Sequence, residues 1–247
     1  MSIATVSHTR SRILLVIGIA AFGLLVLLAA ASADAPSSQA STVNEIGLGD
    51  YQFVGRADQD GAQFISYGYV YGVQEVPSSD LFSDPLHPSE ATAYLTYYAT
   101  ATLTARAVIT DAMRSIFALN TAGQMTYYHQ ATPSASFDDP QSFAQGTAVT
   151  TATVRLQDIL TVTAPNRGRA VGNGVATVVA AQDFTLGGQT VRFGRVHQSH
   201  EISTHGDAIR TEPTIPQASV LLAGYAASRS FWQQLLFPYV TRSGALE

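Results

Sequence analysis

The chain has 247 residues, of which 46% are hydrophobic and 13% are charged, a length that suffices for one core of ordinary size or two small ones. All 13 basic residues are arginines scattered along the chain, and the formal net charge is -5. Because nucleic-acid binding needs a basic patch, this distribution argues against it, and the absence of lysine excludes a Schiff-base or P-loop lysine.

Residues 1–33 have the three parts of a secretory signal peptide. Arg10 and Arg12 precede an uncharged run from Ile13 to Ala31, and small residues end in Ala31-Ser32-Ala33. Cleavage after this motif predicts an exported protein, secreted or held in the cell envelope. The apolar run is also close to the ~20 residues that span a bilayer, so an uncleaved anchor over residues 13–31 is the alternative and the only expected membrane contact.

The chain contains no cysteine and no Asn-x-Ser/Thr acceptor. An exported form therefore has neither disulfides nor a cysteine-linked lipid anchor, which favours a bacterial source. Residues 34–45 are small and polar without periodicity, as is typical of a flexible linker.

Strand signals dominate from residue 46 onward. The run from Phe64 to Val73 alternates, with three tyrosines on one parity and two glycines on the other, and the proline-rich stretch from Val73 to Glu90 predicts a long loop. The longest alternation runs from Ala91 to Ile109, with one face of small apolar residues and one face of threonines. After it, residues 120–123 predict a four-residue hairpin turn.

A second long alternation spans residues 146–162. It is followed by a strand through residues 175–184, a two-residue hairpin at Gly187-Gly188, and last strands at 191–203 and 219–226. No window from 46 to 227 has a convincing helical period.

The strand lengths favour one architecture. A straight strand of 19 residues would extend ~60 Å at ~3.3 Å per residue, more than a compact domain of this size, so the run must coil, bulge or change sheets. Residues 46–227 are therefore predicted to form an all-β domain, an antiparallel barrel of roughly eight strands. A β-sandwich is the alternative, and an outer-membrane barrel is disfavoured because the apolar parity is mostly alanine.

The C-terminal segment, residues 228–247, has a different composition. It contains the only tryptophan, Trp232, in an aromatic cluster that Pro238 follows. The pattern predicts a short helix that closes one barrel end, or a segment that docks on a membrane surface or a partner.

Asp158 is the most specific candidate functional residue. It breaks the apolar parity between Leu156 and Leu160, where an unpaired carboxylate is costly or stays protonated. Three explanations remain open: a bulge turns it outward, it pairs with Arg106 or Arg155, or it lines a ligand cavity as a functional acid.

His197 and His200 lie in the densest polar cluster, His197-Gln198-Ser199-His200-Glu201. On a strand they would face opposite sides, and the order H-x-x-H-E matches no zinc-protease motif, so no metal site is predicted. They remain weak acid–base candidates beside Asp158.

Four tyrosines are candidate lining residues of an amphipathic pocket in the barrel mouth: Tyr67, Tyr69, Tyr97 and Tyr127. The alternative is that they form aromatic cross-strand pairs that only stabilise the sheet.

The sequence contains no G-x-S-x-G, P-loop or dinucleotide fingerprint, and no cofactor is predicted. The leading hypothesis is an exported, non-catalytic barrel that binds a small amphipathic ligand or a protein partner. The alternatives are a cavity-based enzyme that uses Asp158 with His197 or His200, and a structural protein of the cell envelope. The sequence leaves the oligomeric state open.

Overall fold

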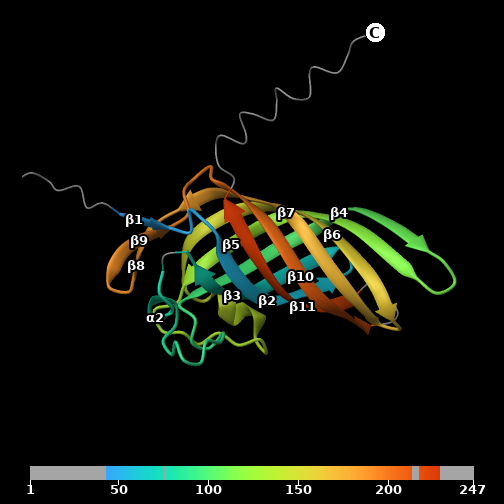
Figure 1. Ribbon diagram of the computed structural model, residues 1–247, viewed down its shortest axis with the longest axis horizontal. Helices are drawn as coiled ribbons and strands as arrows, with labels where there is room; N and C mark the ends of the chain where they lie inside the picture. The colour runs from blue at the N-terminus through green and yellow to red at the C-terminus, as the bar shows by residue number, and fades with distance from the viewer. Residues whose placement is uncertain (1–42, 75, 213–216, 229–247) are drawn as a thin grey trace, which may run out of the picture. The chain divides into compact units, whose positions relative to one another are not determined.

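The computed structural model describes residues 43–74, 76–212 and 217–228, and these contain a closed antiparallel barrel of eight strands (Figure 1). The strands follow the order β10-β11-β2-β3-β4-β5-β6-β7 around the barrel. Their bounds are β2 Tyr51–Asp60, β3 Gln63–Val73, β4 Leu95–Thr110, β5 Ser115–His129, β6 Thr147–Ala164, β7 Arg167–Ala181, β10 Ser199–Glu212 and β11 Gln217–Ser228. The predicted fold class is confirmed, with closure rather than a sandwich.

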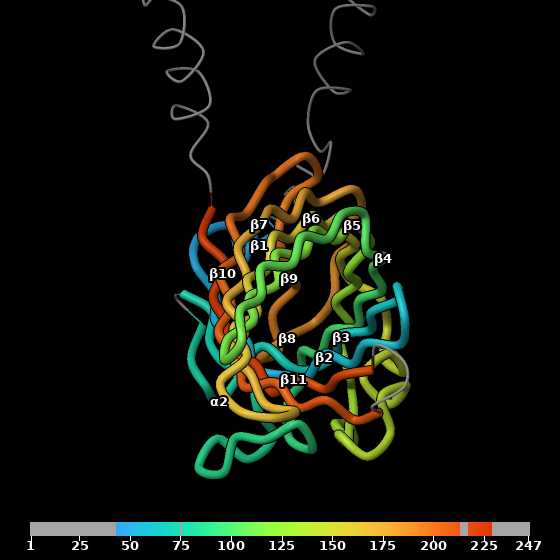
Figure 2. Tube along the Cα trace, turned by 90° about the vertical axis from the view of Figure 1, so that its right-hand side faces the viewer, coloured from blue at the N-terminus to red at the C-terminus, as the bar shows by residue number. Residues whose placement is uncertain are grey.

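The strands tilt steeply around the barrel. A path that starts at Tyr97 on β4 and passes from each residue to its pairing partner on the next strand does not return to Tyr97. After one circuit of the barrel it reaches Val108 on the same strand. This stagger lets the sheet of eight strands close into a barrel, whose closed outline Figure 2 shows.

The two ends of the barrel differ in their connections. The β2–β3, β4–β5 and β6–β7 turns, each short, lie at one end, which we call the turn end. The long connections lie at the other end, the capped end. They contain α2 (Ser78–Leu81), the 3-10 helix η1 (Pro140–Ala144), and the strands β8 (Asp183–Leu186) and β9 (Gln189–Phe193).

A small second sheet in the order β1-β9-β8 covers the capped end (Figure 1). Strand β1, Asn44–Ile46, pairs in parallel with β9, so Asn44 and Glu45 belong to a strand rather than to the expected linker. The β8–β9 turn is the predicted hairpin: Gly187 and Gly188 have φ of 57° and 77°, a left-handed conformation that glycine adopts without strain.

Two strand predictions are wrong. Residues 120–123 continue β5 without a turn, because Asn120 to Gly123 pair with β4 on one side and β6 on the other. The predicted strand 191–203 is two strands, β9 and β10, separated by a turn that contains His197 at φ 70°. The first error arises because turn residues within a strand are tolerated when both neighbouring strands supply hydrogen bonds. At the second, Gly194 and His197 both adopt a positive φ, a turn that the strand pattern did not show.

Residues 1–42 and 229–247 lie outside the described residues. The expected signal segment 1–33, most of the expected linker and nearly all of the C-terminal aromatic segment therefore have no structural description. Among the described residues, no helix is long and apolar enough to cross a membrane.

Candidate functional site

The barrel interior contains a cavity of about 140 Å³. Its walls are mainly apolar and come from inward residues of all eight strands, among them Phe53, Ala101, Met125, Leu156, Ile202 and Val220. An apolar cavity of about 150 Å³ is large enough for a benzene-sized group. The described core therefore has a space of ligand size at its centre.

The cavity continues into a wider mouth at the turn end, with a volume of about 270 Å³. Cavity and mouth share five residues: Gln59, Leu119, Leu160, Ala208 and Ala218. The mouth lining includes Arg106, Arg167 and Arg210 and no acidic residue. A molecule that enters at the turn end therefore passes arginines before it reaches the apolar cavity.

Asp158 points into this cavity. The pairing of β6 with β5 and β7 is continuous at Gln157 and Asp158, so the bulge considered for this position is absent. Arg155, one of the two arginines considered as its partner, lies on the exposed parity of β6, and no ion pair or hydrogen bond of Asp158 is found within the described chain. Of the three explanations, the structure supports a carboxyl group that lines a cavity.

Burial raises the pKa of Asp158 from 3.8 to about 6. The pairing partner on β7 is Gly172, where an added Cβ would lie 2.2 Å from Asp158 Oδ1 and 2.5 Å from Thr204 Oγ1. A side chain at Gly172 would thus occupy the space that Asp158 fills, which explains the glycine there. The carboxyl group has room in the cavity but no partner among the described residues.

Tyr97 contributes a second polar group without a partner to the cavity lining. Its side chain is 1% exposed, and its hydroxyl finds no hydrogen-bond partner among the described residues. The hydroxyl oxygen of Ser66, which donates to the carbonyl oxygen of Arg56, is close enough to lower the pKa of Tyr97 somewhat but lies outside hydrogen-bond geometry. Burial raises the pKa of Tyr97, so this hydroxyl stays a neutral donor. A buried hydroxyl without a partner costs free energy, and a ligand acceptor would remove that cost.

The four candidate tyrosines do not meet in one pocket. Tyr97 lines the cavity, and Tyr127 lies deeper, where its hydroxyl is 2.6 Å from that of Tyr51. Tyr67 and Tyr69 are on the outward parity of β3. Tyr67 donates to Asp58 Oδ2 at 2.7 Å, and Tyr69 packs edge-on against Phe82. These two tyrosines hold the long loops of the capped end against the barrel wall.

The three residues of the acid–base alternative, Asp158, His197 and His200, do not lie close to one another. His200 is inside the barrel at the capped end, 3% exposed, with Nε2 at 3.0 Å from the carbonyl oxygen of Gly47. Asp158 shares a register row with Thr204, four residues farther along β10, so it lies ~13 Å from His200 along the strand, with Ile202 between. His197 is exposed in the turn before β10. None of the three can exchange a proton with another.

Burial lowers the pKa of His200, which keeps it neutral inside the capped end. Its ring centroid is 5.3 Å from that of Tyr51, in an edge-on contact. The surroundings are those of a packed core histidine. No group of three or more histidine, aspartate or glutamate side chains that could hold a metal occurs in the described part of the chain.

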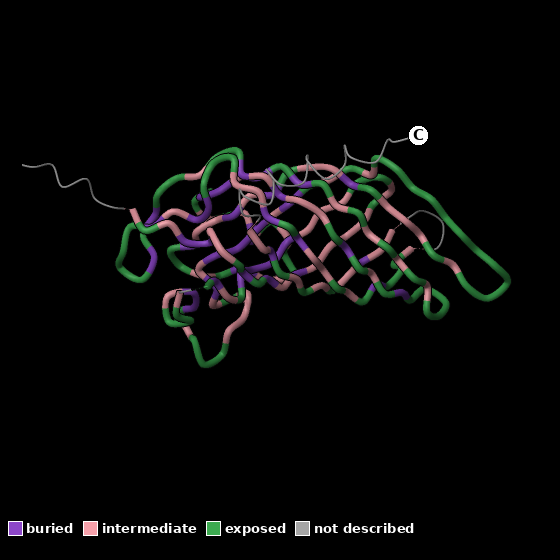
Figure 3. The backbone as a smooth tube through the Cα atoms, turned by 45° about the horizontal axis from the view of Figure 1, so that its top comes forward, coloured by how far each residue is buried: buried purple, intermediate pink, exposed green. Residues whose placement is uncertain are grey.

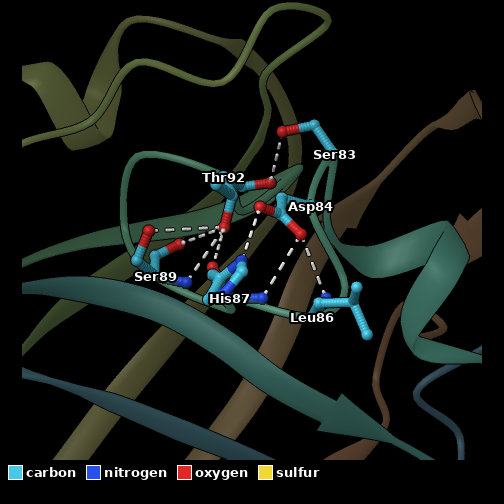
Figure 4. A network of polar contacts seen from close by, with 6 residues as sticks. All are labelled: Ser83, Asp84, Leu86, His87, Ser89 and Thr92. Carbon is cyan, nitrogen blue, oxygen red and sulfur yellow. Dashed lines mark hydrogen bonds and ion pairs between the residues drawn. The ribbon is translucent and has the colours of Figure 1, made fainter.

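One constellation escaped the sequence reasoning. In the β3–β4 loop, His87 Nδ1 is 2.9 Å from Asp84 Oδ2, the geometry of the Asp–His half of a catalytic triad (Figure 4). The loop serines bond elsewhere: Ser89 Oγ contacts the hydroxyl of Thr92, and Ser83 Oγ donates to the Thr92 carbonyl. Asp84 also accepts from the backbone N–H groups of Leu86 and His87. The network is exposed and ties the loop together, without a nucleophile aligned on the histidine.

No family model, curated protein or solved structure matches this chain.

Proposed function

We propose that this protein binds a small amphipathic molecule inside the barrel, through the mouth at the turn end, without catalysis. The observation that carries the proposal is an apolar cavity that holds two polar groups without partners among the described residues, the Asp158 carboxyl and the Tyr97 hydroxyl. Apolar walls with a few polar groups are typical of small-molecule sites, where the polar groups orient the ligand.

The cavity volume limits the size of the ligand. At about 140 Å³ it accepts a benzene ring or a short branched chain, and the mouth adds room for a polar group. We also propose that the protein is exported, on the basis of its N-terminal sequence alone.

The test is binding of benzyl alcohol, which combines an apolar ring with one hydroxyl. We expect a saturable rise of the melting temperature of the full chain with ligand concentration. The variant Ala101→Phe fills the cavity from its inward face and should abolish the rise. Thr100→Phe, on the exposed face of the same strand, is the matched control and should preserve it. Equal responses of both variants and the natural chain would reject the cavity as the binding site.

A further inference from the structure

The cavity and its mouth carry opposite charges in a defined order. On β4 the inward residues Tyr97, Ala99 and Ala101 line the cavity, and Arg106 lines the mouth. On β6, Asp158 lies on the cavity wall just inside the mouth residue Val162. From the turn end inward, a ligand thus meets a cation, then a carboxyl group, then an apolar space.

A bulge brings Arg106 into the mouth. The register of β4 against β5 shifts between Leu103 and Ala105, so Thr104 is an extra residue and the parity of the strand reverses after it. Arg106 then pairs with inward Leu119, and its guanidinium carbon is 5.1 Å from the ring centroid of Phe117. Stacking on the ring fixes the guanidinium without neutralising it.

Arg106 and Asp158 share one register row. Arg106 pairs with Leu119 on β5, and Leu119 pairs with Asp158 on β6, so their backbones are two strand spacings apart, about 10 Å. No ion pair of either residue is found among the described residues. Both side chains face the interior, with the inward Leu119 between their backbones, so a small molecule in the interior that has a charge of each sign can reach both.

We propose that the ligand is a small zwitterion of the amino-acid type, with its ammonium group on Asp158, its carboxylate on Arg106 and its apolar side group in the cavity. This inference rests on the proposed function and specifies its ligand. The ammonium supplies the counter-charge that the cavity carboxylate lacks, and the guanidinium fork matches a carboxylate. An oxygen on the side group would accept from the Tyr97 hydroxyl farther inside.

The test compares three probes that share a phenyl ring, with calorimetry on the full chain at pH 7.5. L-Phenylalanine has both charges, phenethylamine lacks the carboxylate, and 3-phenylpropanoate lacks the ammonium. We expect phenylalanine to bind about tenfold or more tightly than either analogue, because each charged contact is lost in one of them.

Two variants assign the charges. Asp158→Asn should reduce phenylalanine to the affinity of 3-phenylpropanoate, and Arg106→Gln should reduce it to that of phenethylamine. Arg155→Gln, on the exposed face of β6, is the control and should leave all three affinities unchanged.

The outcomes separate this inference from the proposed function. If benzyl alcohol binds but phenylalanine has no advantage over its analogues, the zwitterion is rejected and the apolar cavity site stands. If phenylalanine binds best but neither Asp158→Asn nor Arg106→Gln changes its affinity, the assignment of the charges is overturned. If no probe binds, benzyl alcohol included, both proposals fail.

Discussion

The two ends of the barrel differ in how their openings are filled: the capped end is packed with aromatic side chains, and the turn end is open. At the capped end, Phe193 of β9 packs between Tyr51 and Tyr127, with ring centroids 5.2 and 4.9 Å away. At the turn end, tight turns leave the interior open, and the β4–β5 hairpin extends away from the barrel with exposed residues (Figure 3). One end therefore contributes aromatic packing to the fold, while the other end leaves the cavity accessible.

This division follows from the connections. Long connections between neighbouring strands can fold back over a barrel end, and here the β7–β10 connection supplies β8 and β9, which bring Phe193 into the opening. Turns of two to four residues are too short to place a side chain over the barrel opening as Phe193 does. The cavity therefore lies on the side of the short turns.

Removal of the plug should have the largest effect. Phe193→Ala deletes a fully buried ring at the capped end and should lower the free energy of unfolding by about 3 to 5 kcal/mol. Phe117→Ala, the partly buried ring at the turn end, should cost about 1 kcal/mol. Urea unfolding of both variants measures the difference, and equal losses would contradict the division between the two ends.

A change at Asp158 should have the next largest effect, and it depends on pH. The unfolded chain titrates this carboxyl near 3.8 and the folded chain near 6, so between these values the folded chain binds more protons. The contribution of Asp158 to stability is therefore most favourable below pH 4 and is lost, by about 2 to 3 kcal/mol, as the pH rises through 6. Asp158→Asn should remove this fall and be more stable than the natural chain at pH 7.5.

Urea unfolding from pH 3.5 to 7.5 measures the difference between the two proteins, which cancels the contributions of other groups. A difference that does not change with pH would show that Asp158 titrates normally and is well solvated.

His200 should give a smaller effect with the opposite sign. Burial lowers its folded pKa, so the unfolded chain binds more protons below pH 6.5, and stability falls as the pH decreases through this window. His200→Gln should remove this decrease and cost about 1 kcal/mol at pH 7.5, since the contact with the Gly47 carbonyl is lost. His197→Gln, exposed in the neighbouring turn, is the control, and a matching pH response in it would refute the assignment.

The alternating patterns predicted the walls of the barrel, because inward and outward positions alternate wherever one face is buried. They failed at residues 120–123, where local turn chemistry competes with two neighbouring strands that the sequence does not identify. The parity of the β6 run placed Asp158 on an apolar face with three explanations open, and the structure, which has no bulge there, supports the one in which it lines a cavity. The same reasoning put Arg106 on the threonine face of its run, and only the bulge at Thr104 turns it into the mouth.

The candidate tyrosines show the same limit. The alternation of the sequence places Tyr67 and Tyr69 on one face of β3, but it does not say which face of the strand points into the barrel. Long loops cover the outer face at Tyr67 and Tyr69, so these two tyrosines are buried although they point away from the barrel interior. The unpartnered hydroxyl of Tyr97 has no sequence signal at all.

The sequence by itself determined the all-β class, the strand periodicity, the Gly187-Gly188 hairpin and the one carboxylate within an apolar face. These depend on local sterics and on burial, which act within a few residues. The tertiary structure decided the closure of the barrel, the end that is plugged, and the row that places Arg106 and Asp158 around one cavity. These depend on strand stagger and on a single bulge, which are properties of pairing between distant segments.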